Sequence, residues 1–141
     1  MYRRFLIALA FTALLAGPSG ALAAEGPAKS PKLQHIALGQ EIKLADHLVA
    51  GKTTVFDFYS DFCPPCVAMT PKLEKLHQSR ADVVVIKVDI NRPGVKGIDW
   101  KSPVAQQYKL RSIPHLKVFG PNGKLMAEGN EARAMVERWF K

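Results

Sequence analysis

Two runs of apolar residues dominate the chain and predict the central strands of a sheet. Residues 53–59 and 83–88 are nearly continuous stretches of β-branched and aromatic side chains. Such runs are typical of strands that are covered by helices on both faces. A shorter alternation at residues 41–44 predicts another strand, followed by a short helix at 45–49.

A long helix is predicted directly after the first apolar run. Pro71 lies inside this segment, residues 63–79, and should kink the helix because proline removes a backbone hydrogen bond. Ser102 and Pro103 form an N-cap followed by proline at the first helical position, which predicts a second helix through residue 108. The apolar positions of the first helix are Val67, Met69, Leu73 and Leu76.

The last part of the chain predicts a β-hairpin and a closing helix at residues 130–140. Residues 116–119 and 124–128 flank a turn that contains Asn122 and Gly123, a strong hairpin signal, so these strands should be antiparallel. With the parallel pair before it, the pattern predicts an α/β fold: a mixed central sheet with helices on both faces. The side chains of the closing helix that we expect to cover the sheet are Ala134, Met135, Trp139 and the stem of Arg138.

The N-terminal residues predict a secretory signal. Two arginines precede an apolar stretch at residues 5–16, and Ala21 and Ala23 place small residues where cleavage before Ala24 needs them. A helix of that stretch rises only about 18 Å, short of a hydrocarbon core of about 30 Å, which argues against an uncleaved anchor. We expect a protein exported to a periplasm or beyond, where disulfides persist. The expected divisions are a cleaved signal peptide at 1–23, a leader or linker at 24–39 and one domain at 40–141.

The charge of the chain adds little about partners. Lys and Arg number 20 against 12 Asp and Glu, for a formal net charge of +8. The basic residues are interleaved with acidic and apolar ones, and no nucleic-acid-binding motif accompanies them, so we expect a solvated surface and no nucleic acid partner. We expect the protein to be a monomer.

Cys63 and Cys66 are the only cysteines of the chain, and they flank Pro64 and Pro65 directly after the first apolar run. A pair this close closes almost no loop, so it is a poor structural staple. At a helix N-terminus, the dipole and free N–H groups stabilise the thiolate of Cys63, which is the attacking species. Cys66, one turn later, can then resolve a mixed disulfide. The motif predicts redox chemistry.

Other uses of such a motif stay open at this point. A zinc site would need further ligands, but the four histidines are scattered without ligand spacing. An inert structural disulfide is a second alternative. Cu(I) accepts two thiolates, so a thiol-based copper-binding chaperone module is a third. The usual additional copper ligands are missing, because Met69 and Met126 are isolated and fit core positions.

Over about residues 40–141, the order of these motifs resembles thioredoxin. Asp57 lies six residues before the first cysteine, where thioredoxins keep a buried aspartate, and Pro71 lies five after the second, where they kink the helix. Lys87 matches the lysine of the neighbouring strand, and Ile113 and Pro114 match the peptide bond that is cis in the family. The resemblance implies a thioredoxin fold and an exported thiol–disulfide oxidoreductase. The redox centre would be its own dithiol, with no bound cofactor or metal.

Asp57 and Lys87 also have a physical reason to be paired. Each interrupts an apolar strand, and burial of a lone carboxylate is costly, so the two charges are expected to face each other. The resemblance implies that Asp57 acts as base for Cys66 and that Lys87 modulates its pKa. A purely structural ion pair is the alternative.

The resemblance further implies a substrate-binding surface around the cysteines. A cis bond before Pro114 would set the Ile113 backbone beside the disulfide, where its N–H and C=O can pair with an extended substrate strand. Phe62, Pro64 and Pro65 replace the Trp and the Gly-Pro that are usual in thioredoxins. Phe62 still provides an aromatic edge to this surface.

The direction of exchange depends on how well the Cys63 thiolate is stabilised. Val67 supplies no cation beside the pair and Pro64 supplies no N–H, which favours a reductant of protein disulfides. His115 acts the other way if its imidazolium reaches the thiolate, so a disulfide oxidase or isomerase is the alternative.

Electrons must come from another protein, and the resemblance implies a membrane thiol-transfer protein as donor. Residues 91–101, a longer connection than in thioredoxins, are either a partner-recognition loop or a solvated insertion.

Overall fold

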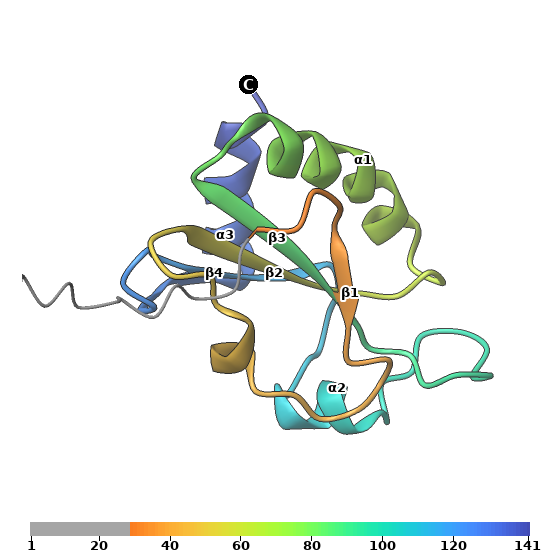
Figure 1. Ribbon diagram of the computed structural model, residues 1–141. Coiled ribbons are helices and arrows are strands. Elements are labelled where there is room, and N and C mark those ends of the chain that lie inside the picture. The colour runs from red at the N-terminus through yellow and green to blue at the C-terminus, as the bar shows by residue number, and fades with distance from the viewer. Residues whose placement is uncertain (1–28) are drawn as a thin grey trace, which may run out of the picture.

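The structure is a computed structural model that describes residues 29–141 (Figure 1). The predicted signal peptide and the first residues of the predicted leader lie outside this range. Along the chain the elements are β1 (Gln34–Ile36), the 3-10 helix η1 (Leu44–His47), β2 (Thr53–Tyr59), α1 (Pro64–Ser79), β3 (Val83–Asp89), α2 (Pro103–Gln107), β4 (His115–Phe119), β5 (Leu125–Glu128) and α3 (Gly129–Trp139).

Five strands form one mixed sheet in the order β1-β3-β2-β4-β5. β1 and β2 both run parallel to β3, β4 is antiparallel to β2, and β5 is antiparallel to β4. The unit β2–α1–β3 is therefore a parallel crossover, and the turn between β4 and β5 uses Gly123 at φ 75°. The predicted α/β fold with a mixed sheet is confirmed.

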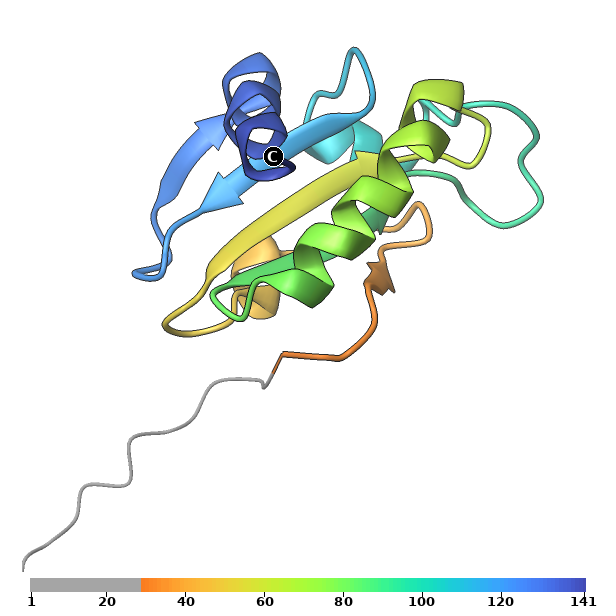
Figure 2. The same ribbon diagram turned by 90° about the horizontal axis from the view of Figure 1, so that it is seen from above.

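Helices cover both faces of the sheet, which explains why its central strands are apolar throughout. α1 and α3 lie together on one face, where they pack on side chains such as Val55 and Val85 (Figure 2). α2 and η1 lie on the opposite face, against side chains such as Phe56 and Ile86 (Figure 1). Each central strand thus contributes alternate residues to two separate cores.

Two predictions for the N-terminal part of the domain were wrong. Residues 34–36 were expected in a linker, but they form β1 and pair with β3. Residues 41–44 were expected to form a strand, but the chain enters η1 at Leu44 instead. β1 already occupies the sheet edge beside β3, so no strand position is left there for residues 41–44.

The buried faces of the helices also differ from the prediction in part. Val67 is 53% exposed, because the buried stripe of α1 passes through Cys66 and Val67 lies one position further round the helix. Met126, expected in the core, is equally exposed on the edge strand β5. In α3 the buried residues are Ala132 and Val136.

Of the four α3 side chains that were predicted to cover the sheet, Met135 and Trp139 are partly buried against the core, whereas Ala134 and Arg138 are exposed. None of the described helices combines the length and the apolarity that a membrane crossing requires.

Candidate active site at the amino end of α1

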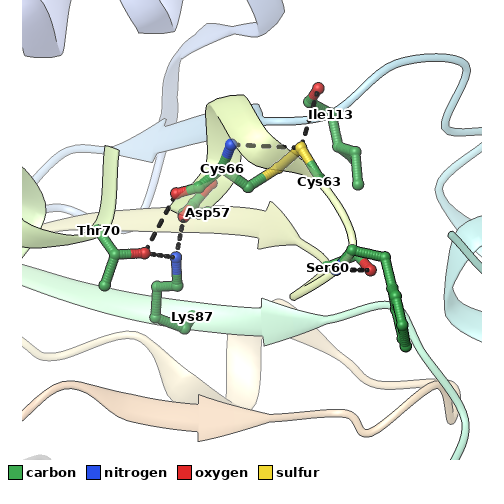
Figure 3. The surroundings of a disulfide bond; sticks show 8 residues. Asp57, Ser60, Cys63, Cys66, Thr70, Lys87 and Ile113 are labelled. Carbon is green, nitrogen blue, oxygen red and sulfur yellow. Dashed lines mark hydrogen bonds and ion pairs between the residues drawn. A yellow bond between two sulfur atoms is a disulfide. The ribbon is translucent and has the colours of Figure 1, made fainter. Parts of the chain in front are cut away.

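The two cysteines occupy the first turn of α1 and are joined by a disulfide (Figure 3). Cys63 is the N-cap, and the backbone N–H of Cys66 donates to its Sγ at 3.2 Å. Pro64 and Pro65 open the helix, where a missing N–H costs little because first-turn N–H groups have no partner within the helix. The Cys66 N–H is thus the helix donor that meets this sulfur, and the same bond stabilises a Cys63 thiolate.

Both cysteines are sheltered from solvent, and Cys63 is the less buried of the two. Their side chains are 2% and 0% exposed for Cys63 and Cys66 respectively. The Sγ of Cys63 lies 3.7 Å from the carbonyl oxygen of Ile113 (Figure 3). The Ile113–Pro114 peptide bond is cis. The structure therefore brings the segment between α2 and β4 beside Cys63.

The residues predicted to bind substrate surround the disulfide. Phe62 is 49% exposed, and Pro64 and Pro65 are exposed as well. Ile113 and Pro114 are half-buried. The backbone of Phe62 is fixed, because its N–H donates to the Oγ of the buried Ser60 at 3.1 Å. The exposed aromatic ring is thus carried by an ordered backbone at the edge of the site.

A buried ion pair lies beneath α1. Asp57 of β2 and Lys87 of β3 are register partners, and Lys87 Nζ donates to Asp57 Oδ2 at 2.7 Å. Neither side chain is exposed to solvent. The predicted pairing of these two charges is confirmed.

The carboxyl of Asp57 is poised to take up a proton. Burial raises its pKa above the ordinary value, and the Lys87 ammonium offsets part of that rise. Its second oxygen, Oδ1, is buried and has no hydrogen-bond partner among residues 29–141. A carboxylate with a raised pKa and an acceptor oxygen that no described group contacts is suited to the role of a base.

Thr70, which was not predicted as a site residue, connects this ion pair to the dithiol. Its hydroxyl donates to the carbonyl of Cys66 at 3.2 Å and accepts from Lys87 Nζ at 2.9 Å (Figure 3). Threonine inside a helix often bonds to the carbonyl four residues earlier, and that spacing from the second cysteine was the available signal.

Tyr59 and His35 complete the surroundings of Lys87, a role that the sequence did not predict for either residue. Lys87 Nζ lies 4.0 Å from the centroid of the Tyr59 ring, a cation–π contact. The Tyr59 hydroxyl is hydrogen-bonded to Nδ1 of His35 at 2.8 Å, and burial raises the pKa of that hydroxyl. The ammonium thus has a carboxylate, a hydroxyl and an aromatic face around it.

His115 bonds to an acidic side chain of the hairpin. Its Nε2 lies 3.0 Å from Oε1 of Glu128, and its ring packs edge-on against Phe58. The same carboxylate is paired with Lys117. In the described part of the chain, the hydrogen-bond partner of this ring is therefore Glu128 of the hairpin.

Comparison with known proteins identifies the family. The family model described as thioredoxin matches residues 40–139, nearly the whole described domain. The chain belongs to the thioredoxin family. Its dithiol, the cis bond beside it and the ion pair beneath it are therefore parts of a thiol–disulfide oxidoreductase, as predicted.

Individual relatives agree with this assignment. The thioredoxin of Mycoplasmoides gallisepticum is 30% identical over 93 residues, which cover 66% of this chain and 82% of that protein. The chloroplastic F-type thioredoxin of Mesembryanthemum crystallinum is 32% identical over 82 residues, which cover 58% of this chain but only 39% of that protein. The crystal structure of spinach chloroplast thioredoxin F (short form) has a TM-score of 0.53 at 25% identity, covering 80% of this chain and 95% of that one.

Thioredoxins use their own disulfide as redox centre and need no cofactor. In this protein the Cys63–Cys66 disulfide is that centre. Across residues 29–141, no group of three or more His, Cys, Asp or Glu side chains is placed to hold a metal ion.

Proposed function

We propose that this thioredoxin is exported and reduces disulfides of other exported proteins, with Cys63 as nucleophile and Cys66 as resolving thiol. The contacts of Cys63 Sγ are the observation that supports reduction, and not oxidation, of the substrate disulfide. These are the Cys66 N–H and the Ile113 carbonyl, while His115 is hydrogen-bonded to Glu128. A thiolate stabilised mainly by a helix end is a comparatively poor leaving group, so the dithiol is the better electron donor.

The exchange takes place in two steps. The Cys63 thiolate attacks one sulfur of the substrate disulfide, a mixed disulfide forms, and the other substrate sulfur leaves as a thiolate that takes up a proton. The Cys66 thiol then loses its proton to Asp57, and its thiolate attacks Cys63 Sγ. The Cys63–Cys66 disulfide forms, the second substrate thiol is released, and two electrons have passed to the substrate.

In this mechanism Asp57 is the base for the resolving thiol. Its raised pKa and its Oδ1, which has no hydrogen-bond partner among residues 29–141, support the assignment. Lys87 stabilises the carboxylate through the 2.7 Å bond, and Thr70 ties Lys87 to the helical turn that carries Cys66. The position of the pair, covered by α1 and beneath the dithiol, limits the access of water to the proton transfer.

Ile113 and Pro114 are assigned to substrate binding, with Phe62, Pro64 and Pro65 forming the exposed edge. A substrate strand that lies along Ile113 places its disulfide over Cys63. Oxidised protein must then be re-reduced by a second protein. For an exported protein, we assign this role to a membrane thiol-transfer donor.

The direction is tested by the equilibrium potential of the dithiol against glutathione. We expect a value below about −200 mV together with reduction of insulin disulfides; a value near −120 mV with rapid oxidation of unfolded proteins would assign an oxidase instead. A Cu(I) titration of the reduced protein addresses the copper alternative, since tight stoichiometric binding without reductase activity would favour it.

Export is tested separately. Mass spectrometry of the protein from fractionated cells should find it outside the cytoplasm with Ala24 as first residue. An intact N-terminus in the cytoplasmic fraction would contradict this part of the proposal.

A further inference from the structure

Leu38 is held in a strained backbone conformation and is exposed beside the active-site edge. Ala37, Leu38 and Gly39 have φ values of 77°, 47° and 79°, a run of three left-handed residues of which only one is glycine. Leu38 is 53% exposed, so its own burial offsets the strain only in part. Strained residues that persist tend to mark functional positions, and here the strain directs a large apolar side chain outward.

The position of Leu38 is fixed by a close contact with the next loop. A Cβ atom on Gly39 would lie 2.6 Å from the backbone nitrogen of Arg92, so only glycine permits this approach. The N–H of Gly39 donates to the carbonyl of Asp89 at 2.9 Å, and the carbonyl of Gly39 accepts from Val104. The turn after β1 is thus locked against the base of the segment between β3 and α2.

That segment, residues 91–101, is held in shape by hydrogen bonds between its own residues. The amide of the buried Asn91 donates to the carbonyls of Val95 and Gly97, and its oxygen accepts from the N–H of Asp99. The Asp99 carboxylate binds the guanidinium of Arg92 through two bonds of 2.7 and 3.0 Å. The loop projects beyond the sheet as a defined shape (Figure 1), which favours a recognition role over a solvated insertion.

Between this loop and the active-site edge lies a cavity of about 460 Å³, which we call the Leu38 groove. Its apolar lining includes Leu38, Phe62, Pro93 and Val95. Of the polar lining groups, Asp89, Asn91 and Arg92 are engaged in hydrogen bonds within the loop and at its start, and Lys96 is exposed. The groove therefore offers mainly apolar surface, in the size range that accommodates a large side chain.

We propose that the Leu38 groove binds a large apolar side chain from an extended segment of the partner protein whose disulfide reacts with Cys63. The proposal rests on the proposed function. Phe62 lines the groove and is the chain neighbour of Cys63, so the groove adjoins the reacting sulfur and can receive a residue that flanks a disulfide bound there. A second copy of this chain seated there would cover the edge of the dithiol site, and self-association is accordingly one of the outcomes of the test.

The groove is also preorganised for this occupant. The hydrogen bonds and close approach of Gly39 hold the turn that carries Leu38, Ser60 holds the backbone of Phe62, and the Asn91 and Asp99 bonds hold the loop. A site whose walls are already ordered loses less entropy when a partner binds, and it discriminates by the size of the inserted side chain.

The test uses two synthetic peptides, each with a central cysteine carried as a mixed disulfide with thionitrobenzoate. In one peptide Phe flanks the cysteine on both sides at a spacing of two residues, and in the other Ser takes those places. Attack by Cys63 releases the coloured thionitrobenzoate anion and gives the rate constant for each peptide. We expect the reduced wild-type protein to react about tenfold faster with the Phe peptide.

Leu38→Asn and Val95→Ser should bring that ratio close to one while leaving unchanged the rate with dithiobis(nitrobenzoic acid), which has no peptide to bind. Leu38→Asn should also raise the thermal unfolding midpoint, because Asn tolerates the left-handed conformation. A structural role for Leu38 does not give this combination of lost selectivity and higher stability. Leu125→Asn is the matched control: a similarly exposed leucine (49%) on β5, at the opposite edge of the sheet from β1.

Equal rates for the two peptides, or a ratio that survives both groove substitutions, would overturn the proposal. A reversible dimer in sedimentation that Leu38→Asn abolishes would also overturn it, by assigning the groove to a second copy. If the reduced protein reacts with neither peptide nor with dithiobis(nitrobenzoic acid), the proposed function itself fails, and this result is distinct from a loss of selectivity alone.

Discussion

Lys87 lies directly opposite Asp57 in adjacent parallel strands, with Nζ 2.7 Å from Oδ2 and with both side chains fully buried. A pair of this kind gives little net stability, because taking two charges out of water costs about as much as their attraction returns. Its position beneath the turn that holds Cys66, to which Thr70 connects it, indicates that the pair serves the chemistry of the resolving thiol.

The first prediction concerns Asp57→Asn. This change should slow resolution of the mixed disulfide about 100-fold near neutral pH, because it removes the base while preserving the shape of the side chain. In the wild type, resolution should slow as the pH falls through the raised pKa of Asp57, whereas the variant should lose this dependence. Single-turnover reduction of a disulfide peptide measures both effects.

The same substitution should raise the free energy of unfolding at neutral pH. The pKa of Asp57 is higher in the folded protein than in the unfolded chain, so ionisation of this group disfavours folding as the pH rises above about 4. The free energy of unfolding of Asp57→Asn should therefore exceed that of the wild type at pH 7, and the difference should vanish at low pH. Glu74→Gln, an exposed acid on α1, is the control and should change neither rate nor this pH profile.

The second prediction concerns Thr70, which holds the buried ammonium of Lys87. Thr70→Val removes an acceptor at 2.9 Å and should lower the free energy of unfolding by about 1–3 kcal/mol. It should also shift the pH profile of resolution, because Lys87 loses one of the contacts that orient it toward Asp57. Thr70→Ser keeps the hydroxyl and should retain the wild-type profile. A profile that is the same in all three proteins would reduce Thr70 to a packing residue.

The sequence predicted the parts of this protein whose pattern is local. Both end residues of β2 were predicted correctly, because a short run that is apolar on both faces is typical of a strand covered by helices on both sides. Asp57 and Lys87 were identified as a pair because each charge interrupts such a run. The N-cap of α2 at Ser102 likewise follows from residue types at fixed spacing.

The features that the sequence did not predict depend on contacts between distant segments. β1 has three residues and no buried face of its own, so only pairing with β3 makes it a strand. The bond from His35 to Tyr59 and the bond from Thr70 to Lys87 each join separate elements. The strained turn at Leu38 has no signature in composition, because its left-handed residues include ordinary ones.

The third prediction assigns the two thiols. Cys66→Ser should trap covalent complexes with substrate proteins, because Cys63 still attacks but nothing resolves the mixed disulfide. Cys63→Ser should trap almost none, since Cys66 is completely buried. Non-reducing gels of complexes purified from cells measure the yield. Brief alkylation of the reduced wild type should modify Cys63 first, and preferential modification of Cys66 would reverse the assignment.

The fourth prediction concerns His77, a buried histidine at the far end of α1. Its Nδ1 accepts from the N–H of Val85 at 3.0 Å, and its Nε2 donates to the carbonyl of Ser30 at 2.8 Å, so the neutral ring bridges β3 and the start of the described chain. Protonation of Nδ1 would break the bond to Val85. Burial lowers the pKa of His77 accordingly, with the Ser30 carbonyl acting in the opposite direction.

The sign of the resulting pH dependence follows from that lowered pKa. An unfolded histidine titrates near pH 6.5, so His77 contributes its full stabilisation above about that value and loses it as the pH falls towards its lower folded pKa. His77→Gln should be less stable than the wild type by about 1–3 kcal/mol at pH 8, where the Val85 N–H loses its partner. The gap should narrow as the pH falls to 5, because only the wild type loses the contribution of His77 there. Urea unfolding at both pH values measures it, with His47→Gln on η1 as a control that should keep the wild-type pH dependence. A gap of the same size at pH 8 and pH 5 would show that His77 does not titrate on unfolding.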